Sequence, residues 1–273
     1  MRVLRKGLSG ADVRQWELFL HGHGFTFTKP RDEEFDAETE KLTKEFQKKN
    51  KLVADGIVGN ATFGVAMRQG FEAVPFTDEP EAKFPDKPDF DPIVGNTARN
   101  MIFGPLEFRP GPTNGDFGKE TITVTNNFES AKIVRVPVPE VAGISGAGSS
   151  GKMRFHIAGA AQLAGLWAAW GRKKLIKKIL TFDGSLAFRF IRCSNSSLSN
   201  HAFGTAFDIN ADENPFGSQP ALPSEKGCVF ELVPIAHKFG FYWGGHFTRR
   251  DGMHFEIAKI LSQAEVDSAL AKF

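Results

Sequence analysis

SLSNHAFGTAFDIN, residues 197–210, places a histidine and an aspartate seven positions apart, with a glycine and small residues between them. Its last part, TAFDI, alternates as a β-strand does, so the large apolar residues share one face and Asp208 lies on the other. Because the apolar face goes to the core, Asp208 is expected to point into a cleft. His201 precedes this strand in a turn, where Gly204 allows backbone angles that other residues avoid. Alone, the stretch fits half of a metal site or an ordinary turn and strand.

A second stretch, DGMHFEI at residues 251–257, has the same form. As a strand it points its apolar residues to the core, whereas His254 and Glu256 face the opposite way. Two separated strands thus each present a metal-ligand type of residue opposite a hydrophobic face. Glu256 is expected either to orient a metal ligand or to be an ordinary surface carboxylate.

Two histidines and one carboxylate are a recurrent ligand set of catalytic zinc, with the fourth position left to water. Zinc lowers the pKa of that water from about 15.7 to about 7. The chemistry also needs a base that takes the proton and passes it to a leaving amine. Asp251, three residues before His254, suits that role. No HExxH pattern occurs in the sequence, which excludes the helical zinc-protease site.

The composition is that of a soluble globular protein, with 41% hydrophobic and 24% charged residues. A formal charge of +2 gives no support for nucleic-acid binding, and no run approaches the roughly 20 apolar residues of a membrane helix. The N-terminus lacks the apolar core of a secretory signal. We therefore expect a monomer that is made in the cytoplasm and has no stable membrane association. Cys193 and Cys228 are expected to be reduced thiols.

The pattern of the chain changes twice along its length. Residues 1–72 indicate three short amphipathic helices, the second of which begins after Asp36, an N-cap candidate. Residues 75–112 hold eight of the fifteen prolines, and such a segment cannot form an ordinary helix or central strand. We therefore expect residues 73–117 to be an extended linker, with part of it able to lie along the second domain.

Residues 118–273 indicate an α+β domain with a mostly antiparallel sheet flanked by helices. Strands are expected at 121–125, 132–138, 186–191, 205–209 and 253–257. Helices are expected within 151–180, on both sides of Gly171, and at 230–239 and 262–272. The whole chain is thus expected to be α+β, with a small three-helix bundle, a proline-rich linker and a larger C-terminal domain.

The C-terminal domain resembles the zinc D,D-carboxypeptidase and L-alanyl-D-glutamate endopeptidase family, which cleaves peptidoglycan stem peptides. The resemblance covers roughly residues 118–260 and rests on two distant motifs that occur in the family's order. The motifs are SxHxxGxAxD, at Ser199, His201, Gly204, Ala206 and Asp208, and DxxH, at Asp251 and His254, with WGG at residues 243–245 just before it.

The resemblance implies that His201, Asp208 and His254 bind zinc and that Asp251 is the catalytic base. It also implies an arginine that steadies the developing oxyanion or a substrate carboxylate.

FRFIR offers Arg189 and Arg192 for that arginine. In a strand the two face opposite ways, so only one can reach the cleft, and Arg189 is the preferred candidate. His246 is expected either to line the cleft and stabilise the transition state or to be a satisfied loop histidine.

The N-terminal segment resembles the three-helix peptidoglycan-binding domain. Each element is ordinary by itself, but their order and spacing are those of the family. The elements are GxxGxxV at residues 7–13, FDxxT at 35–39, Phe46-Gln47 and DGIVGxxT at 55–62. Such domains bind the wall without cutting it, so bacterial peptidoglycan is the expected partner.

The combined expectation is an endolysin-like zinc peptidase that hydrolyses a stem-peptide bond, with the bond between L-alanine and D-glutamate preferred. Such an enzyme acts on the cell wall, in the periplasm, after release from the cytoplasm, as phage endolysins do. Two alternatives stay open: a D,D-carboxypeptidase that releases terminal D-alanine, and a non-catalytic wall-binding protein that retains the zinc fold.

Overall fold

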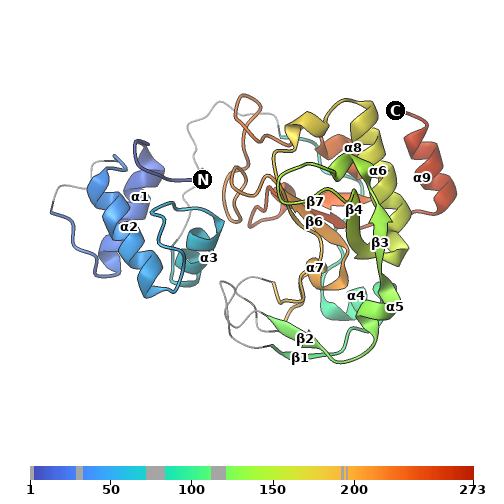
Figure 1. Ribbon diagram of the computed structural model, residues 1–273, viewed down its shortest axis with the longest axis horizontal. Coiled ribbons are helices and arrows are strands. Elements are labelled where there is room, and N and C mark those ends of the chain that lie inside the picture. Colours follow the sequence, from blue (N-terminus) through green and yellow to red (C-terminus); the bar gives the residue numbers. More distant parts are fainter. Residues whose placement is uncertain (1–2, 29–32, 72–83, 112–120, 192–193, 195) are drawn as a thin grey trace.

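A computed structural model of the chain describes residues 3–28, 33–71, 84–111, 121–191, 194 and 196–273. Within them, no helix is both long and apolar enough to cross a membrane. Figure 1 shows a small helical part at the N-terminus beside a larger part that contains the sheets. Each part buries its own cluster of apolar side chains. The α+β class predicted from the sequence is confirmed.

The N-terminal part packs α1 (Ala11–Gly22), α2 (Ala37–Lys49) and α3 (Asn60–Arg68) around one tryptophan. Trp16 is fully buried, and its indole nitrogen donates to Thr43 Oγ1 at 2.9 Å. The bond satisfies the one polar group that a buried indole carries. These three helices are the ones that the apolar spacing predicts, and Asp36 caps α2 as expected by accepting from two backbone amides.

The proline-rich segment differs from the predicted linker. It contains α4 (Asn96–Phe103) and the short strand β1 (Phe108–Pro110), and Phe103 is fully buried in the core of the C-terminal part. The expectation that this segment forms no ordinary helix is therefore wrong. The reason is that its prolines occur at residues 75–92 and 105–112, which leaves residues 93–104 free to form a helix.

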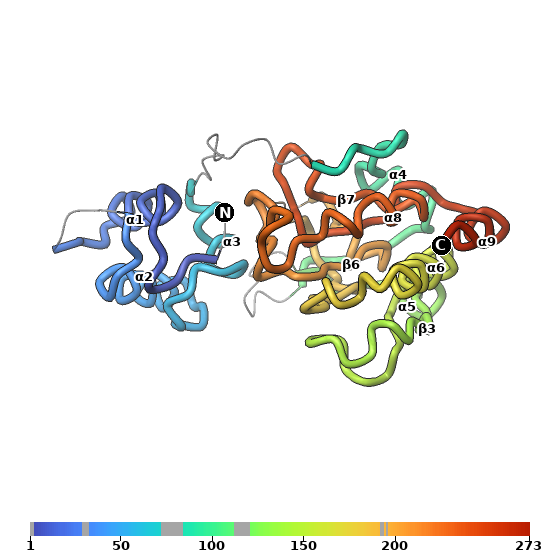
Figure 2. Tube along the Cα trace, turned by 90° about the horizontal axis from the view of Figure 1, so that it is seen from above, coloured from blue at the N-terminus to red at the C-terminus, as the bar shows by residue number. Residues whose placement is uncertain are grey.

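The C-terminal part has its main antiparallel sheet in the order β5-β6-β8-β7. Two smaller antiparallel pairs, β1 with β2 and β3 with β4, lie outside that sheet. The strands are β2 (Ile122–Val124), β3 (Ile133–Pro137), β4 (Lys152–His156), β5 (Phe182–Gly184), β6 (Ala206–Ile209), β7 (Phe241–Trp243) and β8 (His254–Ile257). The helices are α5 (Phe128–Lys132), α6 (Ala160–Arg172), α7 (Asn200–Phe203), α8 (Val233–Lys238) and α9 (Gln263–Leu270). In Figure 2 the N-terminal helices lie to one side of this body of strands and helices.

Two expectations for this part are wrong. Residues 186–191 form only isolated bridges to Thr121 and Leu198, and the edge strand β5 lies a few residues earlier. Residues 152–156, placed in a helical stretch, form β4 instead and pair with β3. Residues 186–191 are a short apolar run, which periodicity alone does not assign, whereas residues 152–156, KMRFH, alternate polar and apolar side chains, a strand pattern that the helical expectation overlooked.

The buried face of the main sheet fixes which residues face the other way. Phe207 of β6 stacks on Phe255 of β8, with ring centroids 5.4 Å apart and planes 7° apart. Trp170 of α6 packs edge-on against both rings. Since neighbouring residues of a strand alternate between faces, Asp208 and His254 point to the opposite face.

Candidate metal centre

Strand register brings two of the candidate ligands together. Asp208 of β6 lies directly opposite His254 of β8 in the antiparallel ladder. Directly opposed residues have Cβ atoms about 5 Å apart, so their side chains meet on one face. The ladder thereby joins residues that are 46 positions apart in the chain.

The one-turn helix α7 positions His201, the third candidate ligand. Ser199 caps α7, its hydroxyl accepting from His201 N at 3.3 Å, and Gly204 ends the helix in the left-handed conformation, with φ 65°. Glycine adopts this backbone angle without strain, whereas a Cβ at Gly204 would in addition meet the flexible end of the Ile133 side chain, Cδ1, at 2.6 Å. This sharp stop turns the chain from His201 directly into β6.

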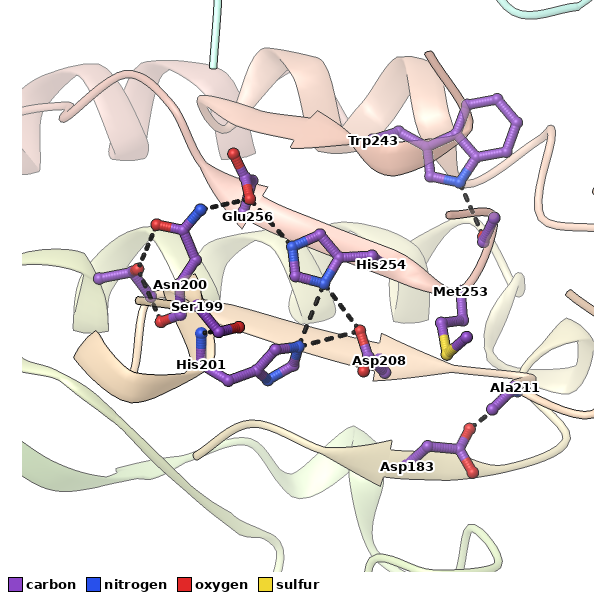
Figure 3. A network of polar contacts seen from close by, with 12 residues as sticks. Asp183, Ser199, Asn200, His201, Asp208, Ala211, Trp243, Met253, His254 and Glu256 are labelled. Atoms are coloured by element: carbon purple, nitrogen blue, oxygen red, sulfur yellow. Dashed lines mark hydrogen bonds and ion pairs between the residues drawn. The ribbon is translucent and has the colours of Figure 1, made fainter. Parts of the chain in front are cut away.

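Three donor atoms converge at the end of this arrangement, as Figure 3 shows. His201 Nε2 lies 3.1 Å from Asp208 Oδ1 and 3.1 Å from His254 Nδ1, and the last two atoms are 2.9 Å apart. Tetrahedral zinc with bonds near 2.0–2.1 Å would place its ligand atoms about 3.3 Å from one another. Among the described residues, this is the one group of three or more ligand-type side chains that could hold a metal ion. The donor set and spacing fit zinc.

The electrostatics of the cluster favour a cation at the same point. Burial lowers the pKa of His201, and burial would raise that of Asp208, but the two histidines hold the pKa of Asp208 well below its usual range. Burial also disfavours a charged His254, yet hydrogen bonds to Asp208 and Glu256 raise its pKa to about 10. A metal ion bound to His254 Nδ1 would therefore displace a proton.

Glu256 is a buried partner of His254 rather than a surface carboxylate. Its exposed fraction is 4%, and its Oε2 lies 3.0 Å from His254 Nε2. A carboxylate on the far nitrogen fixes the imidazole tautomer, so that Nδ1 presents its lone pair to the metal position. Asn200 donates from Nδ2 to the same Glu256 oxygen. The sequence interpretation missed Asn200, and its position next to His201 was the available signal.

Asp251 lies in the turn that leads into β8. Its backbone N–H donates to Gly244 O at 2.9 Å, and its backbone carbonyl accepts from His254 N at 3.1 Å. A Cβ at Gly244 would lie 2.5 Å from that carbonyl oxygen and 3.1 Å from His254 Cβ, so only glycine allows this approach. Trp243, fully buried, donates from Nε1 to Gly252 O at 2.8 Å and braces the same turn. Asp251 is thus held by the backbone that also orients His254.

The remaining candidates are less closely tied to the cluster. The pKa of His201 is lowered mainly by burial, and the positive charges of His254 and Arg189 lower it further. Nη1 of Arg189 donates to Phe190 O at 3.2 Å. Arg192 lies outside the described residues. Cys193 also lies outside them, and Cys228 is a buried free thiol.

His246 packs among aromatic and histidine rings. Its ring lies edge-on to Trp243, with centroids 5.1 Å apart, and 5.5 Å from the ring of His237. Burial lowers the pKa of both histidines to about 4, so both are neutral at physiological pH. Within the part of the chain that the structure describes, neither Nε2 atom has a hydrogen-bond partner. His246 is thus a packed histidine, and none of these contacts is with His201, Asp208 or His254.

Each part of the chain contains a segment that matches a known family. Residues 192–257 match the family described as D-alanyl-D-alanine carboxypeptidase, and residues 9–65 match a peptidoglycan binding domain. The first match includes all three converging residues and Asp251. None of the curated proteins matches the chain.

One solved structure is similar over a limited region. It is a peptidoglycan-binding protein from Clostridioides difficile in complex with glutamine hydroxamate, 37% identical, with a TM-score of 0.24. The similarity covers 25% of this chain and 42% of that one, so the match spans less than half of that protein's length. The chain thus carries a segment similar to a peptidoglycan binding domain, followed by a segment similar to D-alanyl-D-alanine carboxypeptidases.

Proposed function

We propose that this protein is a zinc-dependent peptidoglycan peptidase that hydrolyses a stem-peptide bond, namely the one between L-alanine and D-glutamate. The observation that carries the proposal is the convergence of His201, Asp208 and His254 inside the segment that matches the carboxypeptidase family. A wall-binding segment in the same chain favours a bond that lies within intact wall.

His201 Nε2, Asp208 Oδ1 and His254 Nδ1 would hold the zinc ion. When bound there, zinc supplies a water molecule of lowered pKa and a Lewis acid for the scissile carbonyl. Asp251 would accept the proton of the attacking water and pass it to the leaving amine. Arg189 would steady the negative charge on the substrate, and its distance from His201 is short enough for their charges to interact.

Product analysis tests the choice of bond. Purified peptidoglycan is digested with the protein, and the new termini are identified by mass spectrometry after labelling of free amines. We expect new D-glutamyl amino groups. Release of free D-alanine without such amines would replace the proposal by a D,D-carboxypeptidase, the activity that the family description favours.

The N-terminal part would act as an anchor that holds the peptidase against its substrate. Asn60, at the start of α3, donates from Nδ2 to Ala211 O at 3.3 Å and contacts Met253 Sδ at 3.4 Å, and its Oδ1 accepts from Phe216 N at 3.1 Å. Met253 directly precedes the ligand His254. A cavity of about 910 Å³ is lined by Asn60 and by residues of both parts, among them Asp55 and Glu213. Peptidoglycan bound by the first part would thus lie next to the metal centre.

Deletion of residues 1–71 tests the anchor. Binding through two sites raises avidity by about 10²–10⁴, so we expect a loss of at least tenfold in the rate of lysis of intact wall. The rate on soluble stem-peptide fragments should stay close to that of the full chain. The cut has to fall before residue 84, because Phe84 and α4 pack on the C-terminal core. Equal losses on wall and fragments would rule out an anchoring role.

The proposed substrate places the site of action in the bacterial cell wall. Synthesis in the cytoplasm followed by release to the wall, as in phage endolysins, is part of the proposal. Lysis of cells only when the protein is added from outside, or when a membrane hole is made at the same time, would support it.

A further inference from the structure

A chain of buried polar side chains runs from the metal cluster to α4. Arg99 donates from Nε to Asn200 Oδ1 at 2.8 Å and from Nη1 to Leu198 O at 3.1 Å. Asn200 donates in turn to Glu256, which accepts from His254 Nε2. The exposed fractions of Arg99, Asn200 and Glu256 are 4%, 3% and 4%. Figure 3 shows the inner part of this chain, with Asn200 and Glu256 beside His254.

Each bond in this chain has only one possible direction. A guanidinium has donors and no acceptor, so the oxygen of the Asn200 amide must face Arg99 and its NH₂ group must face Glu256. An ionised carboxylate only accepts, so Glu256 requires a proton on His254 Nε2. When a metal ion takes the place of one proton of His254, the proton that remains is the one that Glu256 holds on Nε2, so Nδ1, the atom that faces Asp208 and His201, provides the lone pair. Arg99 thus fixes the orientation of His254 through Asn200 and Glu256.

Charge compensation supports the same role. Glu256 is a buried carboxylate, and a buried charge without a compensating partner is strongly unfavourable. Arg99 is a buried cation whose positive charge interacts with Glu256 through Asn200. The side chain of Asn96 secures the same helix to the approaching loop, with bonds of 2.8 Å to Ser196 O and from Leu198 N.

We propose that Arg99 is a positioning residue of the metal centre: through Asn200 and Glu256 it holds His254 in the tautomer and ring orientation that bind a divalent cation. This inference rests on the proposed function, because it assumes that His254 is a metal ligand. It adds a determinant that lies outside both family-matched segments, in the stretch that the prolines mark as a linker.

The test is the affinity of the full-length protein for Co²⁺, measured by competition with a chelator and by the absorption spectrum of the bound ion. Loss of an outer-shell partner of a ligating histidine costs about 10–100-fold in metal affinity, which is the loss that we expect for Arg99→Met. Arg99→Lys should lose affinity in the same direction, because an ammonium cannot serve both acceptors with a planar fork. Arg172→Met removes an arginine that donates to the backbone carbonyl of Leu270 and should bind Co²⁺ like the wild type.

A double-variant cycle separates positioning from a general loss of stability. If Arg99 acts through Glu256, then Arg99→Met combined with Glu256→Gln should bind Co²⁺ no more weakly than the worse single variant. Losses that multiply, or wild-type affinity and an unchanged Co²⁺ spectrum in folded Arg99→Met or Arg99→Lys, would overturn the inference. Should Arg99→Met fail to fold, Arg99→Lys decides by itself. A wild-type protein that binds no Co²⁺ would instead overturn the proposed function.

Discussion

Replacement of His201 or His254 by alanine is expected to abolish peptidoglycan hydrolysis, with a fall of at least about 10³-fold in kcat/KM. Each substitution removes one of the three atoms that lie within 3.1 Å of one another, and two donors do not retain a catalytic ion. Treatment with a strong chelator should have the same effect on the wild type, and added zinc should restore activity in the wild type alone.

The measurement combines the rate of wall lysis with the metal content of the purified proteins. His21→Ala is a matched control, because His21 is exposed on α1, far from the cluster in sequence. Circular dichroism of each variant shows whether the fold persists. Activity that resists chelation, or a His254→Ala variant that still lyses wall, would remove zinc hydrolysis as the mechanism.

The second large effect concerns Asp251. Asp251→Asn keeps the size of the side chain and removes its capacity to accept a proton, so kcat should fall by about 10²–10⁴-fold. Zinc content and wall binding should stay unchanged, because Asp251 is not among the three converging side chains. A decrease in kcat with retained metal would also exclude the alternative of a non-catalytic wall-binding protein.

Asp267→Asn provides the comparison for this variant, since it changes an exposed aspartate on α9 in the same way. Steady-state rates on a soluble stem-peptide fragment and metal analysis are needed for both proteins. If lysis is unchanged in Asp251→Asn, another group takes the proton. If zinc is lost, Asp251 is a ligand rather than a base.

The metal cluster could be predicted from the sequence because strand alternation has a period of two residues. Asp208 and His254 each interrupt an apolar run, and alternation alone puts them opposite a buried face. Their direct opposition across β6 and β8 is a matter of register, which no local pattern specifies. The sequence motifs indicated which residues meet, and the ladder shows how.

Other parts of the fold could not be predicted because distant partners determine them. Residues 186–191 form bridges to distant partners instead of a regular strand, and α4 is held through contacts with residues about 100 positions later. Arg99 is an ordinary residue of a polar, proline-rich stretch by composition. Its burial and its bonds depend on a surface that exists only after the sheet has formed.

The packing of α4 against the C-terminal part has a consequence for protein engineering. If the N-terminal part were exchanged for another wall-binding domain, the simplest place to join the two sequences would be the apparent linker. In this protein a junction placed after Phe103 would leave the C-terminal part without Asn96, Arg99 and Phe103. Under the proposed function, the transferable catalytic unit therefore begins before Asn96, well upstream of its recognisable motifs, and grafts that respect this limit should retain their metal.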